Sequence, residues 1–365
     1  MKRVGIVSLY YRNVNYGGLL QSYALQQVIE SLGYDAKQIS YDLSSGNHPS
    51  REVINELRRI YHKVRRWKWE FGYFKQSLKI RKFERMIPHT KRITRATIYR
   101  VNDLFDLFVC GSDQIWNPVG WQPTFFLDFV QDRKRKIAYA ASIARDSLST
   151  NELKYIKSQI EDFSAVSVRE EISVSYLKDY CPNVERMPDP TLLLTQKEWD
   201  LITAERSIDE PYVFAYFLGD NPDNLEKAKR FAKDRGLKIV FIPYLNVANR
   251  FWEAQNKECL RECVGVNDFL SLIKNSEFVL TDSYHGAVFS IVFEKPFFVL
   301  MRFGKKDAFS MNSRIDTLLS DFSLSNRVVN ELVDMYMGEI DWAQVQRKKE
   351  ILEEKGKSFL IHNLG

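Results

Sequence analysis

Short apolar runs alternate with amphipathic segments along most of this chain. A run rich in β-branched residues spans residues 4–9, and leucine, valine and isoleucine then recur at helical spacing over residues 19–32, ahead of Gly33. Further apolar runs predict strands over residues 104–110, 136–142, 165–168, 212–217, 237–242, 278–281 and 296–300. Because helical segments separate many of these strands, the sequence predicts an α/β fold with parallel sheets and crossover connections.

The series of strands and helices is interrupted near residues 195–211, which are polar and carry no strand signal. We therefore expect two domains with parallel sheets that face a cleft, the first over residues 1–205 and the second over residues 206–335. A basic, aromatic-containing helical segment over residues 51–100 interrupts the first domain as an insertion. The charged residues 336–365 predict a C-terminal helix that packs back across a domain.

The composition is that of a globular protein and excludes several other classes of protein. Of its 365 residues, 45% are hydrophobic and 27% are charged, which excludes wholesale disorder and a collagen-like repeat. The four cysteines are too few for a secreted disulfide framework, and Cys259 and Cys263 lack the second pair that a zinc site needs, so we expect no metal. The N-terminus lacks a signal-peptide core, and residues 294–296 interrupt the longest apolar stretch, so we expect a cytoplasmic protein.

Positive charge is concentrated in one segment. The formal net charge is +6, yet residues 51–100 contain 16 lysines and arginines against four acidic residues. Such clustering indicates an anionic partner, but no recognised nucleic-acid fold accompanies it, so we do not expect nucleic acid. Two interpretations stay open, namely peripheral contact with the anionic inner face of the plasma membrane and a solvated helix face. The cations and interfacial aromatics that suggest membrane contact are Arg65, Arg66, Trp67, Lys68 and Trp69.

Polar clusters directly after predicted strands are the candidate site, because ligands bind beyond the carboxyl ends of parallel strands. Four such clusters lie at residues 15–18, 111–114, 167–170 and 281–286. They fall in both halves of the chain, which indicates a cleft between two domains.

His285 and Arg169 are the strongest individual candidates. His285 lies between a predicted strand and a predicted helix, where an imidazole suits proton transfer, although a structural histidine is the alternative. Asp282 would either orient this ring or cap the helix. Arg169 follows another strand, where its planar cation would either hold a carboxylate or phosphate, or pair with Glu170 or Glu171.

Seven segments, in order, resemble the polysaccharide pyruvyl transferase family over roughly residues 4–325. They are NYGGLLQSYALQQVIESLGY (15–34), CGSDQIWN (110–117), KIAYAAS (136–142), SVREE (167–171), DPTLLL (189–194), TDSYHGAVFSIVFEKPF (281–297) and NSRIDTLL (312–319). The resemblance implies a GT-B-like pair of Rossmann-like domains and transfer of pyruvate from phosphoenolpyruvate to a sugar. The sugar would belong to a surface polysaccharide or its lipid-diphosphate-linked precursor, and the product would be a ketal, with release of phosphate. Phosphoenolpyruvate is then a co-substrate, and no bound cofactor is expected.

The resemblance also implies residue roles. The family histidine maps to His285 and the family arginine of the strand-end segment maps to Arg169, and these two would be catalytic. The donor would also contact Ser283, Tyr284 and Gly286 at the start of the helix. Where members that resemble R-L-H at the histidine have an arginine, this chain has a serine, so another cation would take its place. The candidates for that cation are Arg302, Lys305 and Arg314.

The first half would supply the acceptor-sugar site, although loop architecture explains the same residues equally well. The residues concerned are Asn15, Tyr16, Gly17, Gly18, Ser112 and Asp113. Two other functions stay open. A glycosyltransferase that uses a nucleotide sugar shares the expected architecture, and a sugar-binding or assembly subunit without catalysis is the second alternative.

Overall fold

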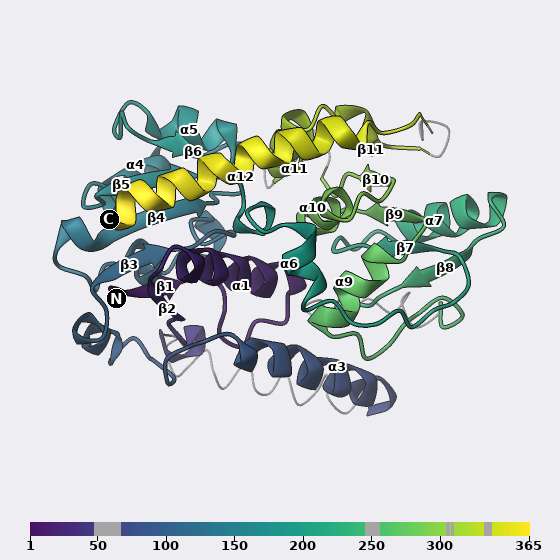
Figure 1. Ribbon diagram of the computed structural model, residues 1–365, viewed down its shortest axis with the longest axis horizontal. Helices are drawn as coiled ribbons and strands as arrows, with labels where there is room; N and C mark the ends of the chain where they lie inside the picture. The colour runs from purple at the N-terminus through teal and green to yellow at the C-terminus, as the bar shows by residue number, and fades with distance from the viewer. Residues whose placement is uncertain (47–66, 245–255, 304–306, 308–309, 332–337) are drawn as a thin grey trace.

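The computed structural model describes residues 1–46, 67–244, 256–303, 307, 310–331 and 338–365. Within these residues the strands form two parallel sheets, one in each half of the chain, and helices cover the faces of both (Figure 1). Helices α1 (Tyr16–Ser31) and α9 (Val266–Lys274) pack against each other between the sheets. The predicted α/β fold with parallel sheets is confirmed. Across the same residues, no helix has both the length and the apolar character that a membrane span requires.

The first sheet has the strand order β2-β1-β3-β4-β5-β6. Its strands are β1 (Arg3–Val7), β2 (Asp35–Gln38), β3 (Leu107–Cys110), β4 (Lys136–Ala141), β5 (Ala165–Val168) and β6 (Glu185–Arg186). The helices of this half, besides α1, are α4 (Thr150–Ile160), α5 (Glu171–Leu177) and α6 (Gln196–Asp200). Because all adjacent strands are parallel, their carboxyl ends meet at one edge of the sheet.

The second sheet has the strand order β11-β10-β9-β7-β8. Its strands are β7 (Tyr212–Tyr216), β8 (Lys238–Phe241), β9 (Phe278–Thr281), β10 (Phe297–Leu300) and β11 (Val328–Val329). The helices of this half, besides α9, are α7 (Pro222–Asp234), α10 (Tyr284–Val292) and α11 (Ser313–Asp321). Strands β7 and β10 are buried at every position, as expected of a parallel sheet that is covered on both faces.

The strands that sequence analysis missed are edge strands. Strands β2, β6 and β11 each lie at an edge of a sheet. β2 is largely polar, and β6 and β11 have only two residues each, too few for a recognisable apolar run. The predicted strand over residues 104–110 is also shorter than expected. It begins at Leu107, because residues 98–103 form a short 3-10 helix and Leu104 is 49% exposed.

The predicted basic insertion over residues 51–100 includes a helix that packs against both halves. Residues Trp67–Met86 form α3, whose Ile80 and Phe83 are buried in the core. On the same helix, Lys79 forms an ion pair of 2.8 Å with Asp268 of α9. Among the residues predicted for membrane contact, Arg65 and Arg66 lie outside the described residues, as do the side chains of Trp67, Lys68 and Trp69.

The C-terminal helix α12 (Trp342–Leu364) runs across both halves and ends beside the first sheet (Figure 1). Phe359 packs on Tyr139, with 5.9 Å between ring centroids. Gly356 allows this approach, because a Cβ atom there would lie 2.5 Å from Leu193 Cδ2 and from the Tyr139 hydroxyl. The close contact therefore requires a residue without a side chain.

We expect Gly356→Ala to lower the free energy of unfolding by about 1–3 kcal/mol, because the added methyl group overpacks this contact. Helix propensity works in the opposite direction, since alanine stabilises a helix by about 1 kcal/mol relative to glycine. Urea denaturation followed by circular dichroism measures the difference, with Ser358→Ala at an exposed position of α12 as the matched control. A Gly356→Ala protein as stable as the control would contradict this packing.

Candidate functional site

Polar side chains from both halves gather beyond the carboxyl ends of the two sheets. Arg169 and Glu170 directly follow β5, and Asp189 comes shortly after β6. In the second half, His285 follows β9. Arg169 and His285 both approach the carboxylate of Asp189. The structure thus brings the two residues predicted as catalytic to one place.

Arg169 is buried and held in one orientation by two carboxylates. Its Nη1 donates to Asp189 Oδ2 at 2.6 Å, and its Nε donates to Glu170 Oε1 at 3.2 Å. The guanidinium also lies 4.2 Å from the ring centroid of Tyr284, so α10 of the second half supports it. Its remaining nitrogen, Nη2, is buried and has no hydrogen-bond partner within the described part of the chain. Such a buried donor is available to an anionic ligand.

Asp189 is fully buried, and both of its oxygens accept hydrogen bonds. Oδ1 accepts from the amide and the hydroxyl of Thr191, at 3.0 and 2.7 Å. Oδ2 accepts from Ser112 Oγ at 3.1 Å as well as from Arg169, and lies 3.7 Å from His285 Nε2. Burial opposes ionisation of Asp189, but the adjacent His285 and Arg169 outweigh it and hold the pKa of this carboxyl well below its usual range. Asp189 is therefore a buried negative charge shared by two basic side chains.

His285 lies at the second position of α10 and is buried against the first half. Ser283 caps the helix by accepting the Gly286 amide at 3.3 Å, which fixes where the helix begins. The imidazole packs on the backbone of Gly17, where a Cβ atom would overlap the ring. Its Nε2 faces Asp189 and has no hydrogen-bond partner among the residues that the structure describes. This nitrogen therefore has a hydrogen-bonding position that no described residue uses.

Asp282 neither orients His285 nor caps α10, contrary to the prediction from sequence. Its carboxylate accepts from the amides of Leu218 and Gly219, at 2.6 and 2.7 Å. It also forms an ion pair of 3.3 Å with Arg302. Asp282 therefore holds the segment after β7 and fixes Arg302 at the margin of the site, where 20% of the arginine side chain is exposed.

Arg314 is a second buried arginine close to Arg169. It lies in the first turn of α11 and donates to the Met311 carbonyl at 3.3 Å, and no carboxylate of the described residues forms an ion pair with it. Burial, followed by the nearby charges of Arg169 and Arg302, lowers the pKa of Arg314 to about 10, so it remains a cation at neutral pH. Arg169 and Arg302 disfavour the charge of Arg314, and an anionic ligand beside Arg314 would offset this. Lys305, the other predicted cation, lies outside the described residues.

The residues predicted for the acceptor include parts of the scaffold. Asn15 caps α1, and its Oδ1 accepts from the amides of Gly17 and Gly18, at 2.9 and 3.4 Å. The two glycines therefore lie inside the helix and not in a loop before it. Tyr16 belongs to the core, where its ring stacks on Phe269 with 4.8 Å between centroids. Gly17 is in contact with His285, through its backbone.

Ser112 and Asp113 follow β3 and lie closer to the charged cluster. Ser112 donates to Asp189, as described above. Asp113 is buried and has a φ of 69°, a left-handed conformation that costs energy for a residue other than glycine. Its carbonyl accepts from the Ser142 amide at 3.0 Å, which ties the ends of β3 and β4 together.

Asp146 of the first half caps α11 of the second half. Its Oδ1 accepts from the Ser313 amide at 3.0 Å, and its Oδ2 accepts from the Asn312 amide at 3.3 Å and from the Ser310 hydroxyl. Burial opposes ionisation of Asp146, but these hydrogen bonds outweigh it and lower its pKa. Because a cap fixes the start of a helix, Asp146 positions the turn that carries Arg314.

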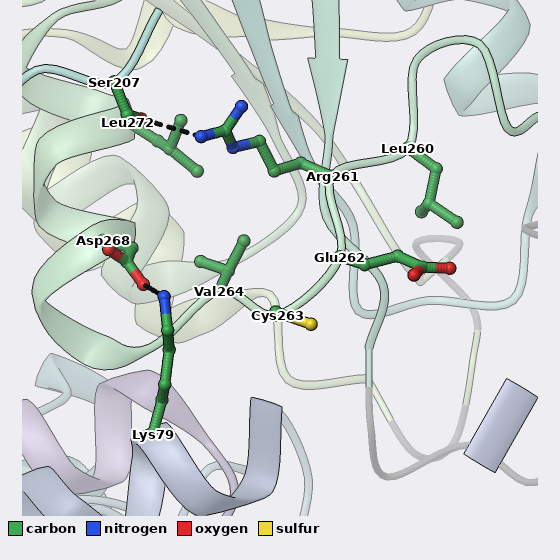
Figure 2. A pocket seen from close by; sticks show the side chains of 9 residues that line it. All are labelled: Lys79, Ser207, Leu260, Arg261, Glu262, Cys263, Val264, Asp268 and Leu272. Atoms are coloured by element: carbon green, nitrogen blue, oxygen red, sulfur yellow. Dashed lines mark hydrogen bonds and ion pairs between the residues drawn. The ribbon is translucent and has the colours of Figure 1, made fainter. Parts of the chain in front are cut away.

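One cavity lies beside the charged cluster. Its volume is about 450 Å³, and residues of both halves line it, among them Leu9, Gln114, Asn117, Phe125, Arg145 and Phe303. Met311 also lines it and accepts hydrogen bonds from Asn117 and Arg314, which places the cavity next to the arginines. A second cavity of about 430 Å³ lies between α3, α9 and residues 260–264 (Figure 2). The predicted site residues line neither cavity, but Met311 links the first one to Arg314. The first cavity is therefore the candidate ligand site.

The described residues contain no group of three or more histidine, cysteine or acidic side chains arranged to hold a metal ion. The cluster is instead rich in basic side chains. It would suit a ligand that brings its own negative charges.

Sequence reasoning missed Asp189 and Asp146 as site residues. Asp189 is the first residue of the DPTLLL segment, and its position after a strand would have marked it as a candidate. The strand itself, β6, has only two residues and no apolar pattern, so it was not predicted. Asp146 caps a helix 167 residues further along the chain, and nothing in its local sequence indicates this. The predicted alternative for Arg169, a pair with Glu170, forms in addition to the pair with Asp189.

A model of the polysaccharide pyruvyl transferase family matches residues 15–302, which is most of the chain. The chain therefore belongs to the polysaccharide pyruvyl transferase family, as the seven segments predicted. Membership supports a transferase of polysaccharide biosynthesis. A comparison with curated protein sequences finds no match.

Solved structures with a similar fold include three UDP-GlcNAc 2-epimerases. The enzyme from Rickettsia bellii is 10% identical, with a TM-score of 0.52 over 99% of this chain and 98% of its own. The enzyme from Neisseria meningitidis, bound to UDP-GlcNAc, is 12% identical, with a TM-score of 0.51 over 100% and 99%. The enzyme from Methanocaldococcus jannaschii is 13% identical, with a TM-score of 0.53 over 97% and 93%. Identity this low shows the fold alone, and the predicted GT-B-like fold is confirmed.

We expect Asp146→Ala to lower the free energy of unfolding by about 1–2 kcal/mol at neutral pH, because α11 loses its cap. Folding lowers the pKa of Asp146. Its contribution to the free energy of unfolding is therefore fully present above the pKa of the unfolded state, about 4, and is lost as the pH falls through the pKa of the folded state. Urea titrations at neutral and acid pH should show a stability difference that shrinks in acid. Asp162→Ala, at an exposed position, is the control, and a difference that does not change with pH would contradict the assignment.

Proposed function

We propose that this member of the polysaccharide pyruvyl transferase family transfers pyruvate from phosphoenolpyruvate to two hydroxyls of a sugar in a surface-polysaccharide precursor. The products would be a cyclic ketal and inorganic phosphate. The observation that carries the proposal is the approach of Arg169 and His285, from different halves, to one carboxylate oxygen, at 2.6 and 3.7 Å. Each keeps a buried nitrogen without a hydrogen-bond partner among the described residues. A small anion that needs both a cation and a proton donor fits this pair.

The donor would be held through its two anionic groups. Arg169 Nη2 and the Arg314 guanidinium would bind the phosphate and the carboxylate, and first-turn amides of α10 would add N–H donors at a helix N-terminus. Arg302 is partly exposed and already paired with Asp282, whereas Arg314 is buried and has no carboxylate partner among the described residues. Arg314 is therefore the stronger candidate for the cation that this chain lacks before His285.

In the proposed reaction, His285 protonates C3 of phosphoenolpyruvate, and the methylene group becomes the methyl group of the product. One sugar hydroxyl attacks C2, the bond between C2 and the phosphate oxygen breaks, and a second hydroxyl closes the ketal ring. One hydroxyl proton replaces the proton delivered to C3, and the other leaves with phosphate, so no further co-substrate is needed. Asp189, 3.7 Å from Nε2, supplies negative charge beside the imidazole while it carries the proton.

The acceptor sugar would occupy the cavity of about 450 Å³ beside the arginines. Phe125 and Phe303 line it from the two halves and offer aromatic surface to the apolar face of a sugar ring. Gln114 and Asn117 offer amide groups to its hydroxyls. Ser112 and Asp113 lie immediately before Gln114, so part of the predicted acceptor segment is next to this cavity.

Product analysis tests the reaction directly. The purified chain would be incubated with phosphoenolpyruvate and with candidate sugars, both free and linked to a lipid diphosphate, and phosphate release and product mass would be measured. We expect phosphate release that depends on the sugar, and a sugar heavier by the mass of pyruvate less one water. Release of a nucleoside diphosphate from a nucleotide sugar, with no phosphate from phosphoenolpyruvate, would favour a glycosyltransferase and contradict the proposal.

We expect His285→Gln to lower kcat by about 10²–10⁴-fold, because general acid catalysis at C3 is lost. The thermal midpoint of unfolding would be measured in parallel to verify that the variant is folded. His362→Gln, at an exposed position on α12, is the matched control and should retain full activity. Near-normal turnover in a folded His285→Gln protein would remove His285 from the mechanism.

We expect Arg314→Gln to raise KM for phosphoenolpyruvate by about 10–100-fold, since a hydrogen bond to a charged group is worth about 1.5–3 kcal/mol. Arg314→Lys should recover part of this loss because it restores the charge. Initial rates measured over a range of both substrates separate the two sites. An unchanged KM for phosphoenolpyruvate with a raised KM for the sugar would assign Arg314 to the acceptor instead.

A further inference from the structure

The outward face of α3 has an unusual composition for a helix of a water-soluble domain. Among residues 74–86, all of which are described, every exposed side chain is either large and apolar or positively charged. The exposed residues are Phe74, Lys75, Leu78, Lys79, Arg81, Lys82, Arg85 and Met86. The acidic residue of this stretch, Glu84, is buried. We call this set of eight residues the α3 outer face.

The α3 outer face is fixed outward by contacts on the opposite side of the helix. Ile80 and Phe83 are buried, and Gln76 donates to the Tyr16 hydroxyl at 2.6 Å. Lys79, at one margin of the face, reaches down to Asp268 of α9, as Figure 2 shows. The helix therefore cannot rotate to bury its exposed apolar side chains without breaking these contacts.

Three large apolar side chains of this face extend into solvent. Phe74 and Met86 are each 57% exposed, and Leu78 is 48% exposed. Because a helix has about 3.6 residues per turn, Phe74 and Leu78 are neighbours on its surface, with Lys82 one turn further on. Helix α12 in the same protein differs, since its exposed face mixes charges of both signs, such as Arg347, Glu350 and Lys355.

We propose that the α3 outer face docks on an anionic lipid bilayer. Apolar side chains interspersed with cations, and no acids, are the composition of helices that lie in the plane of a membrane surface. Phe74, Leu78 and Met86 would enter the boundary between headgroups and acyl chains, and the cations would contact lipid phosphates. The docking does not depend on the proposed reaction, although it would bring the protein to the membrane where lipid-linked sugars reside.

Lipid fits this face better than nucleic acid does. A nucleic-acid surface would use the cations, but Leu78 and Met86 have no partner on a phosphate backbone. Phe74 is the one aromatic side chain among residues 74–86 that is exposed, which is little for the stacking of successive bases. A bilayer offers acyl chains to the apolar side chains and lipid phosphates to the basic side chains of the same face.

Flotation with lipid vesicles tests the proposal without any measurement of activity. The full chain would be mixed with vesicles of phosphatidylcholine, with or without phosphatidylglycerol, at low and high salt. We expect flotation with the anionic vesicles alone, and weaker flotation as salt is added. The triple variant Arg81→Gln, Lys82→Gln, Arg85→Gln should partition about a hundredfold more weakly into anionic vesicles.

Two further variants separate the contributions. Phe74→Gln with Leu78→Gln should weaken binding while leaving its salt dependence unchanged, because the charges remain. Lys154→Gln with Arg347→Gln and Lys355→Gln removes the same amount of charge from exposed positions elsewhere, and should bind like wild type. Circular dichroism would verify that each variant is folded.

Three results would overturn the proposal. The first is no flotation of folded wild-type protein with anionic vesicles at low salt. The second is an equal loss of binding in the two triple variants, which would reduce the effect to net charge. The third is binding to single-stranded RNA that depends on Arg81, Lys82 and Arg85, without vesicle binding, which would make nucleic acid the partner.

Discussion

The buried negative charge of Asp189 is the constraint on which the site depends. A fully buried carboxylate is stable only when basic groups compensate it, and here those groups come from different halves of the chain, as Arg169 and His285. Breaking such a pair by removing one partner leaves an uncompensated charge and typically costs about 3–5 kcal/mol. The geometry of the candidate site and the contact between the two halves therefore depend on the same few atoms.

Local backbone features determine where these atoms lie. Gly17, just inside α1, leaves room for the imidazole, and Ser283 sets the first turn of α10 so that the ring enters that room. Asp146 sets the first turn of α11 and with it the place of Arg314. The N-termini of α1, α10 and α11 thus lie at the interface. Asn15 caps α1, Ser283 caps α10 and Asp146 caps α11.

Much of the fold can be predicted from sequence because the central strands have a local signature. Strands such as β7 and β9 are apolar runs that end in polar residues, and this pattern led directly to His285 and, after β5, to Arg169. The strands β2, β6 and β11 lack the pattern, because β2 is largely polar and the other two have only two residues each. The place of Asp189 after β6 could not be predicted for this reason.

Other features of the site could not be predicted because they depend on distant contacts. The charge of Asp282 suggested an interaction with its neighbour His285, but its carboxylate is engaged by amides after β7 and by Arg302. Tyr16, within a segment suited to a ligand loop, stacks on Phe269, a residue of the other half. Such pairings join residues that are far apart in the sequence, and no window of local sequence contains them.

The proximity of Arg169, Arg302 and Arg314 has a consequence for the protein without substrate. Arg169 and Arg302 are paired with carboxylates, whereas Arg314 has no carboxylate partner among the described residues, so its charge is the least compensated of the three. Under the proposed function, a bound dianion would compensate this charge, so that binding would also stabilise the folded protein.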